Sequence, residues 1–282
     1  MKQLTQPPKI RAVILDLDGT LVGHDTMVAE EVKRTLAETH ETGCKIVICT
    51  GRPSYRAIEI IERLHTLPDY LVACNGAVVI NCHSGKMLSK QVLYPEAAAA
   101  LINEIANVGE TPCAFAEPDN PDEKGVRILY PAGMKLGKWA DGDPRIASSK
   151  AMLHLLPFVP VSVGVYGDRA VMRPLAQRLR TRFVDDCSVI EAGTETVWCV
   201  ETYVHGVGKQ RGVEKVLAVI GIANTETLAI GDHLNDLEMI QAAGIGVAMG
   251  NALPEVRAVA NWVTDSVKQD GVATALRKFV LR

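Results

Sequence analysis

Short, continuous apolar runs separated by helical patterns are the feature that most restricts the fold of this chain. The first runs are 11–15 (RAVIL) and 45–49 (KIVIC), and 71–74 continues the series. A strand that is apolar at every position is buried on both faces, which is typical of a parallel sheet covered by helices. The apolar residues of 28–39 are spaced along one helical face, and Gly43 follows as a stop signal. This alternation predicts an α/β fold with right-handed crossovers.

The same alternation returns near the C-terminus. The sequence predicts a helix over 212–220, a strand over 228–230, a helix over 237–243 and a strand over 246–249. Both ends of the chain therefore fit one doubly wound, mostly parallel sheet.

The middle of the chain has a different texture. Helical patterns at 95–108 and 170–183 stand beside an alternating strand at 161–166 and loop-like segments. We therefore predict that 84–198 is an inserted α+β domain, and that 1–83 and 199–282 form the α/β core.

Composition excludes several classes of protein. The 282 residues carry 30 Lys and Arg against 33 Asp and Glu, a net charge of −3, so no basic excess indicates nucleic acid or an anionic membrane as partner. Aromatic residues make up only 5%, which disfavours base stacking on single-stranded nucleic acid. No apolar run approaches the roughly 20 residues of a membrane span, and we identify no secretory signal.

The seven cysteines do not form a ligand or disulfide pattern. Their number is odd and no CxxC pair occurs among positions 44, 49, 74, 82, 113, 187 and 199. Cys82-His83 has no second pair at a metal-binding spacing, so the sequence gives no reason to expect a zinc site. Buried thiols in a reducing, cytoplasmic compartment are the expectation.

Paired carboxylates follow the first apolar run. Asp16 and Asp18 lie two residues apart where the strand ends, so both can face the same side, and Gly19 allows a sharp turn. Ligands collect at the carboxyl ends of strands in open α/β sheets. A plain Asp-x-Asp-Gly turn is an equally good interpretation of this segment alone.

A second acidic segment follows the apolar run at 228–230. Asp232, Asn235 and Asp236 belong to the stretch GDHLND, which in isolation could also be a solvated loop. If both acidic segments meet at one sheet edge, their like charges need compensation. A hard cation with oxygen ligands supplies it, and Mg²⁺ suits a site that also takes phosphate oxygens.

Two further segments offer partners for an anion. Thr50-Gly51-Arg52 follows the strand at 45–49 and presents a hydroxyl, a backbone N–H and a guanidinium. Lys209 precedes the predicted helix at 212–220, so an ammonium and a positive helix end occur together. Neither segment is specific by itself.

The order of these four segments resembles the motif pattern of the haloacid-dehalogenase-like hydrolases. Within them it is similar to the Cof-type phosphatases, whose large cap is inserted between the second and third motifs. The stretches at 75–77 (NGA), 247–252 (VAMGNA) and 270–276 (DGVATAL) also look like that group.

The resemblance implies a Mg²⁺-dependent phosphomonoesterase that acts on a small phosphorylated metabolite, with sugar phosphates as the expected class. Asp16 is then the nucleophile that forms an aspartyl-phosphate, and Asp18 the general acid and base. An Asp at position 18 disfavours both the dehalogenase branch and the ion-pumping ATPases, which have other residues there.

The remaining roles are also implied by the resemblance. Thr50, Gly51, Arg52, Lys209 and Asn235 are expected to hold the phosphoryl group. Mg²⁺ is expected on Asp16, the backbone carbonyl of Asp18, Asp232 and Asp236. Oligomeric state is left open.

Two alternatives remain at this point. One is a phosphosugar mutase or phosphotransferase of the phosphomannomutase kind, and the other is a non-catalytic, metabolite-binding relative. His24 and His233 are weak candidates for substrate contacts, and the loops at 117–125 and 137–145 are the first places to look for specificity.

Overall fold

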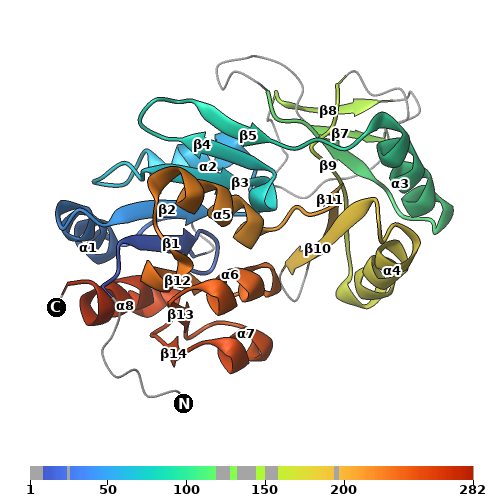
Figure 1. The fold of residues 1–282 in the computed structure, drawn as a ribbon. Coiled ribbons are helices and arrows are strands. Elements are labelled where there is room, and N and C mark those ends of the chain that lie inside the picture. The colour runs from blue at the N-terminus through green and yellow to red at the C-terminus, as the bar shows by residue number, and fades with distance from the viewer. Residues whose placement is uncertain are drawn as a thin grey trace. The chain divides into compact units, whose positions relative to one another are not determined.

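The computed structural model describes residues 9–23, 26–118, 128–131, 144–149, 158–193 and 197–281. The chain divides into two compact units (Figure 1). Unit 1 comprises residues 1–89 and 208–282, and unit 2 comprises residues 90–207. His24 and most of the two proposed specificity loops lie outside the described residues.

The elements of unit 1 come from both ends of the chain. They are β1 (Ala12–Asp16), α1 (Glu30–Glu41), β2 (Lys45–Cys49), α2 (Ser54–Ile61), β3 (Tyr70–Ala73), β4 (Val78–Asn81), β5 (Met87–Lys90), α5 (Lys209–Ile220), β12 (Thr227–Gly231), α6 (Leu237–Ala242), β13 (Ile245–Ala248), α7 (Pro254–Val259), β14 (Trp262–Val263) and α8 (Gly271–Phe279).

One eight-stranded sheet organises unit 1. Its order is β14-β13-β12-β1-β2-β3-β4-β5, and the strands from β14 to β3 run parallel, whereas β4 is antiparallel to β3. The central strand β1 pairs with β2 from the first half of the chain and with β12 from the second. Every residue of β1 is buried.

Helices cover both faces of this sheet, as Figure 1 shows. Helices α5 and α6 pack on one face, and α1, α2 and α8 lie on the other. Alternate strand residues such as Ala12, Val47 and Val72 join Val213 and Val216 of α5 in one buried cluster. The predicted doubly wound α/β fold is confirmed.

Predicted and observed elements differ mainly at their ends. The helix predicted over 212–220 begins earlier, at Lys209, so this residue occupies the first turn of α5 and does not precede the helix. The strand predicted over 11–15 is β1, and it extends to Asp16.

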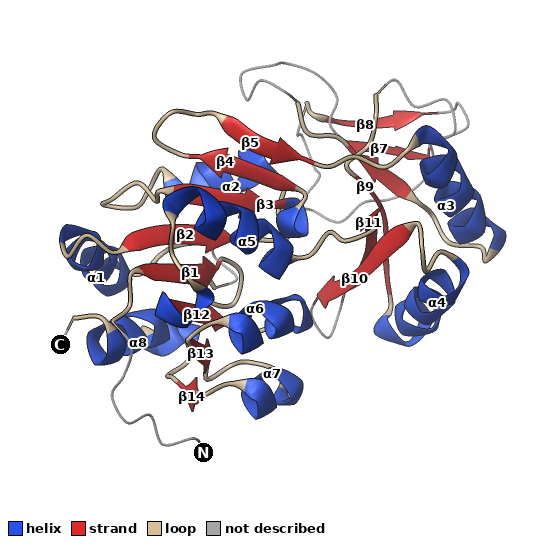
Figure 2. Cartoon of the chain, in the orientation of Figure 1, coloured by secondary structure: helices blue, strands red, loops and turns tan. Residues whose placement is uncertain are grey.

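Unit 2 contains a second sheet, of order β10-β11-β9-β6-β7-β8 (Figure 2). Its elements are α3 (Pro95–Asn107), β6 (Cys113–Phe115), β7 (Ile128–Pro131), β8 (Ile146–Ser149), β9 (Ser162–Gly167), α4 (Arg169–Arg182), β10 (Cys187–Gly193) and β11 (Trp198–Val204). Pairing is antiparallel from β10 to β7, and β7 and β8 are parallel. Helices α3 and α4 pack on its strands.

The border between the units lies farther along the chain than the sequence-based border at 198/199. Strand β11 pairs along its whole length with β10 and along most of it with β9, and so belongs to the sheet of unit 2. The other border lies between residues 89 and 90, six residues after the predicted one.

Among the described residues, no helix combines the length and apolar character needed to cross a bilayer. All seven cysteines are free thiols, and five of them are buried.

Candidate active site

Five neighbouring strands of unit 1 end at one edge of the sheet, and a polar side chain stands at or just after each end. In the sheet order from β13 to β3, these side chains are Asn251, Asp232, Asp16, Thr50 and Asn75. The carboxyl ends of parallel strands are where open α/β sheets collect ligands. This edge therefore brings together residues from both ends of the chain.

The segment after β1 forms a tight loop. Backbone N–H groups of Leu21 and Val22 both donate to the carbonyl of Leu17, at 2.9 Å, and Gly19 donates to the carbonyl of Val22 at 2.8 Å. Asp16 is buried, with 4% of its surface exposed, whereas the Asp18 side chain is half exposed. The Asp-x-Asp-Gly turn is thus present, and it places one carboxylate inside the edge and the other at its rim.

Gly19 is required by this geometry. It has φ +80°, a conformation that L side chains rarely adopt, and an added Cβ would lie 2.2 Å from Oδ2 of Asp232. The loop therefore approaches the second acidic segment as closely as a backbone can.

Helix α5 brings Lys209 to this edge. The helix can pack closely on β3 because Gly212 has no side chain. A Cβ added there would lie 2.4 Å from Cγ1 of Val72. Nζ of Lys209 donates to Oδ1 of Asp16 and to Oδ1 of Asp236, each at 2.6 Å. All three side chains are buried, so this ammonium forms a shielded link between the two acidic segments.

Asp236 also organises the loop after β12. Its Oδ2 accepts from the backbone N–H groups of Asp232 and His233, each at 3.0 Å. Both oxygens of Asp236 thus already have protein donors. In this arrangement Asp236 holds Lys209 and its own loop in place.

Asp232 has an oxygen that the protein does not satisfy. Its Oδ1 is buried and has no hydrogen-bond partner, whereas Oδ2 accepts from Nδ2 of Asn251 at 3.2 Å. The same amide donates to the carbonyl of Gly19 at 2.8 Å. A buried carboxylate oxygen without a donor is costly unless a cation approaches it.

Three carboxylates gather closely enough to share one ion. One oxygen from each of Asp16, Asp232 and Asp236 lies within 4.8 Å of the others. Burial, with the charge of Asp236, raises the pKa of Asp16 to about 7 despite the opposing ammonium of Lys209. Burial, with the charge of Asp16, raises the pKa of Asp232 to about 9.

These observations fit a divalent cation with oxygen ligands. If all groups ionise, three carboxylates and one ammonium leave two negative charges uncompensated. Asp16 and the free oxygen of Asp232 are suitable ligands, and hard cations prefer such oxygens.

Arg52 is held at the rim by Asp18. Its Nε donates to Oδ2 of Asp18 at 2.7 Å and its Nη2 to Oδ1 at 2.5 Å, a bidentate pair. The backbone N–H of Arg52 donates to Oγ1 of Thr50 at 3.1 Å. The guanidinium that the sequence assigned to an anion thus contacts the proposed acid-base residue.

Asn75 and Asn235 meet across the edge. Nδ2 of Asn235 donates to Oδ1 of Asn75 at 2.9 Å, and the backbone N–H of Asn75 donates to the carbonyl of Thr50 at 3.0 Å. Asn75 has φ +53°, and its side chain also faces the position of a Cβ on Gly51.

Sequence reasoning gave no role to Asn75 or Asn251, although both lie in stretches that carried the family resemblance. Their signal was a position within three residues of the end of an apolar strand, similar to the signal that identified Asp16 and Asp232.

Comparison with known proteins identifies relatives over nearly the whole chain. A family model described as haloacid dehalogenase-like hydrolase matches residues 13–276. YxeH of Bacillus subtilis, which bears the name of a candidate phosphatase, is 29% identical over 275 residues and covers 96% of this chain and 98% of its own. YcsE of the same organism, named 5-amino-6-(5-phospho-D-ribitylamino)uracil phosphatase, is 25% identical over 272 residues and covers 96% of both chains.

Solved structures share the fold. A haloacid dehalogenase-like hydrolase from Bacteroides thetaiotaomicron has 25% identity and a TM-score of 0.77, covering 96% of this chain and 99% of its own. A subclass IIB sugar phosphatase has 24% identity and a TM-score of 0.77, covering 95% and 98%.

Proposed function

This chain belongs to the haloacid dehalogenase-like hydrolases and is a phosphatase, and from this premise we propose that it hydrolyses small phosphomonoesters through an aspartyl-phosphate on Asp16. The observation that carries the proposal is the buried contact of 2.6 Å between Nζ of Lys209 and Oδ1 of Asp16. It orients one carboxylate at the end of the central strand and holds a cation beside it. A carboxylate held in this way suits attack on phosphorus.

Asp18 is the proposed general acid and base. Its side chain is half exposed at the rim, so it can exchange protons with a leaving group and with water. Arg52 would keep this carboxylate in place through its two hydrogen bonds until the substrate enters.

We assign the metal site to Asp16, the backbone carbonyl of Asp18 and Asp232. Mg²⁺ bound there would neutralise charge on the carboxylates and on the phosphoryl oxygens. Asp236 is proposed as a positioning residue, because its Oδ1 holds the fully buried ammonium of Lys209 and its Oδ2 accepts from the backbone N–H groups of Asp232 and His233.

The phosphoryl group is proposed to be held by the remaining polar groups of the edge. Lys209 supplies the ammonium, Thr50 the hydroxyl, and Gly51 a backbone N–H. Asn235, fixed by its hydrogen bond to Asn75, would add an amide donor. Positioning and charge compensation are the main demands of phosphoryl transfer, and these groups provide both.

Sugar phosphates or similar phosphorylated metabolites are the proposed substrates. The support is that one relative is named for a phosphoribitylamino compound and one structural neighbour for sugar phosphates. Selection of the leaving group by unit 2 and a cytoplasmic location remain predictions from the sequence.

A screen of phosphomonoesters tests the activity. Purified protein should release inorganic phosphate in the presence of Mg²⁺ and lose the activity in excess chelator. Asp16→Asn should abolish turnover while keeping the circular dichroism spectrum, because only the nucleophile changes. Full activity in Asp16→Asn would show that the nucleophile is another residue.

Product analysis separates a hydrolase from a mutase. A hydrolase releases one phosphate for each substrate consumed, whereas a mutase yields an isomeric sugar phosphate and no free phosphate. The second result would replace our proposal with the phosphotransferase alternative.

A further inference from the structure

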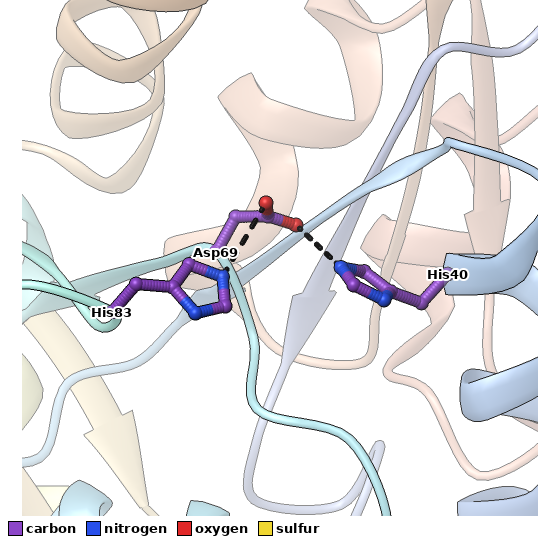
Figure 3. Close-up of side chains that lie close together, drawn as sticks. All are labelled: His40, Asp69 and His83. Carbon is purple, nitrogen blue, oxygen red and sulfur yellow. Dashed lines mark ion pairs between the residues drawn. The ribbon is translucent and has the colours of Figure 1, made fainter.

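A second group of potential metal ligands lies at the opposite edge of the same sheet. Figure 3 shows the imidazoles of His40 and His83 turned toward the carboxylate of Asp69. His40 comes from the last turn of α1, Asp69 directly precedes β3, and His83 follows β4. One ligand atom of each residue lies within 4.8 Å of the other two.

This group is separate from the acidic edge, which is the edge of the sheet that carries Asp16, Asp232 and Asp236. Lys45, which also contacts Asp69, is level with Ala12 at the start of β1, and Asp16 is the last residue of that strand. Four strand steps of roughly 3.3 Å place the two sites about 13 Å apart along the sheet.

Asp69 is held rigidly in the position of a ligand. Its side chain is 5% exposed, and Oδ2 accepts from the backbone N–H of Ile46 at 2.9 Å. Its own backbone N–H donates to the carbonyl of Ile46 at 2.8 Å, and its carbonyl accepts from the N–H of Cys82 at 3.0 Å. This carboxylate therefore cannot leave the edge without breaking the links between strands.

Because one ligand atom of each residue lies within 4.8 Å of the other two, a small movement of the rings can place an ion between the three groups. Nε2 of His40 lies 3.7 Å from Oδ2 of Asp69, and Nε2 of His83 lies 3.6 Å from Oδ1. Two ligands at roughly 2.1 Å from a tetrahedral zinc ion are about 3.4 Å apart. The two histidine side chains are 36% and 50% exposed, so an ion can enter and the rings can adjust.

We propose that His40, Asp69 and His83 form a binding site for a divalent transition-metal ion such as Zn²⁺, distinct from the cation site at the acidic edge. A set of two imidazoles and one carboxylate binds such ions in preference to Mg²⁺, which favours oxygen ligands alone. An ion there would join α1, the start of β3 and the segment after β4.

Lys45 gives the site a built-in competitor. Its Nζ donates to Oδ1 of Asp69 at 2.8 Å, and its side chain is 44% exposed. Repulsion between this ammonium and an incoming cation weakens binding, and removing the ammonium strengthens it.

Calorimetric titration of Zn²⁺ into the full-length protein in excess Mg²⁺, at pH 7.5, tests the proposal. We expect one Zn²⁺ per chain, binding at least tenfold weaker in His40→Ala and in His83→Ala, and tighter binding in Lys45→Met. His65→Ala, which removes an exposed histidine paired with Glu30, is the matched control and should bind as the wild type does.

Further measurements separate the possible outcomes. Asp232→Asn should leave Zn²⁺ affinity unchanged, and the Cu²⁺-loaded protein should show nitrogen couplings from two imidazoles that His83→Ala reduces to one. Absence of Zn²⁺ binding, wild-type affinity in either histidine variant, or loss of binding in Asp232→Asn would each overturn the site. Unchanged circular dichroism in the variants excludes misfolding as the cause.

Discussion

Lys209 is the residue on which the acidic edge depends. Burial alone would lower the pKa of its ammonium, but the charges of Asp16 and Asp236 raise it, so the group stays charged. The positive charge of Lys209 is therefore present before any substrate arrives. It fixes the carboxylate of Asp16 and compensates part of the charge that the fold places beside it.

Replacing this ammonium should destabilise the folded state, because the buried carboxylates lose their positive partner. We expect Lys209→Met to lower the free energy of unfolding of unit 1 by about 3–5 kcal/mol at pH 8 without metal, because Asp16 and Asp236 lose their buried partner. Urea titration with hydrogen–deuterium exchange of β1 as the readout would measure it. Lys268→Met, at an exposed position, is the control, and equal losses in both variants would contradict the expectation.

Stability without metal should depend on pH in a defined direction. Burial raises the pKa values of Asp16 and Asp232 to about 7 and about 9, whereas aspartates of an unfolded chain ionise near pH 4. The folded state thus prefers these groups protonated, and stability is lost as the pH rises from about 4 through 7 and 9.

We therefore expect the melting temperature of chelator-treated protein to fall toward pH 9, and Mg²⁺ to raise it more at pH 8.5 than at pH 5.5. Differential scanning fluorimetry gives both numbers. Asp232→Asn should show a shallower fall and a smaller effect of Mg²⁺. The same Mg²⁺ response in this variant would remove Asp232 from the proposed ligands.

At the scale of elements, the loop after β1 requires a residue without a side chain at position 19. We expect Gly19→Ala to reduce phosphatase activity at least tenfold, since a Cβ there would push Asp232 out of place. Gly43→Ala is a matched control with φ +83° and nothing within 4 Å of the added Cβ. Steady-state kinetics of both variants should separate the contact from the backbone strain, and equal losses would show that strain alone matters.

Leaving groups test the rim of the same loop. General acid catalysis contributes roughly 10²–10⁴-fold, and it matters most for poor leaving groups. Asp18→Asn should therefore lose much more activity on an alkyl phosphate than on p-nitrophenyl phosphate. Comparison of kcat values on the two substrates measures the difference, and an equal loss on both would argue against Asp18 as the acid.

Sequence patterns predicted the strands and helices and some of the residues at the acidic edge. Apolar runs located β1, β2 and β12, and strand ends located Asp16, Thr50 and Asp232, because burial and carboxyl-end position are local properties of the sequence. The bidentate pair of Arg52 with Asp18 and the contact of Asn235 with Asn75 depend on side-chain geometry across the sheet edge. The local periodicity of the sequence cannot predict such contacts.

The same reason explains two other differences. The sequence pattern of strand β11 would fit a strand of either unit, and only its pairing with β10 and β9 assigns it to unit 2. His40, Asp69 and His83 come from three separate segments, so no ligand spacing in the sequence could bring them together.

For the whole molecule, the two units have separate sheets and separate buried clusters. We expect a chain in which residues 90–207 are replaced by a short Gly/Ser linker to fold and to keep Mg²⁺-dependent activity on p-nitrophenyl phosphate. Selectivity among metabolites should disappear, since unit 2 is the proposed source of it. Unchanged ratios of kcat/KM across a metabolite panel would contradict that role.

The pairing of β1 with β12 has a consequence during synthesis. Strand β1 emerges from the ribosome early, but its neighbour on one side, residues 227–231, is made only after all of unit 2. At roughly 5–20 residues per second, the chain takes about ten seconds or more to cover that distance. Through that interval the central strand has an unpaired edge of apolar residues, the kind of surface that chaperones bind. Unit 2 can complete its fold first, so the nascent chain finishes its inserted unit before it can close the sheet of unit 1.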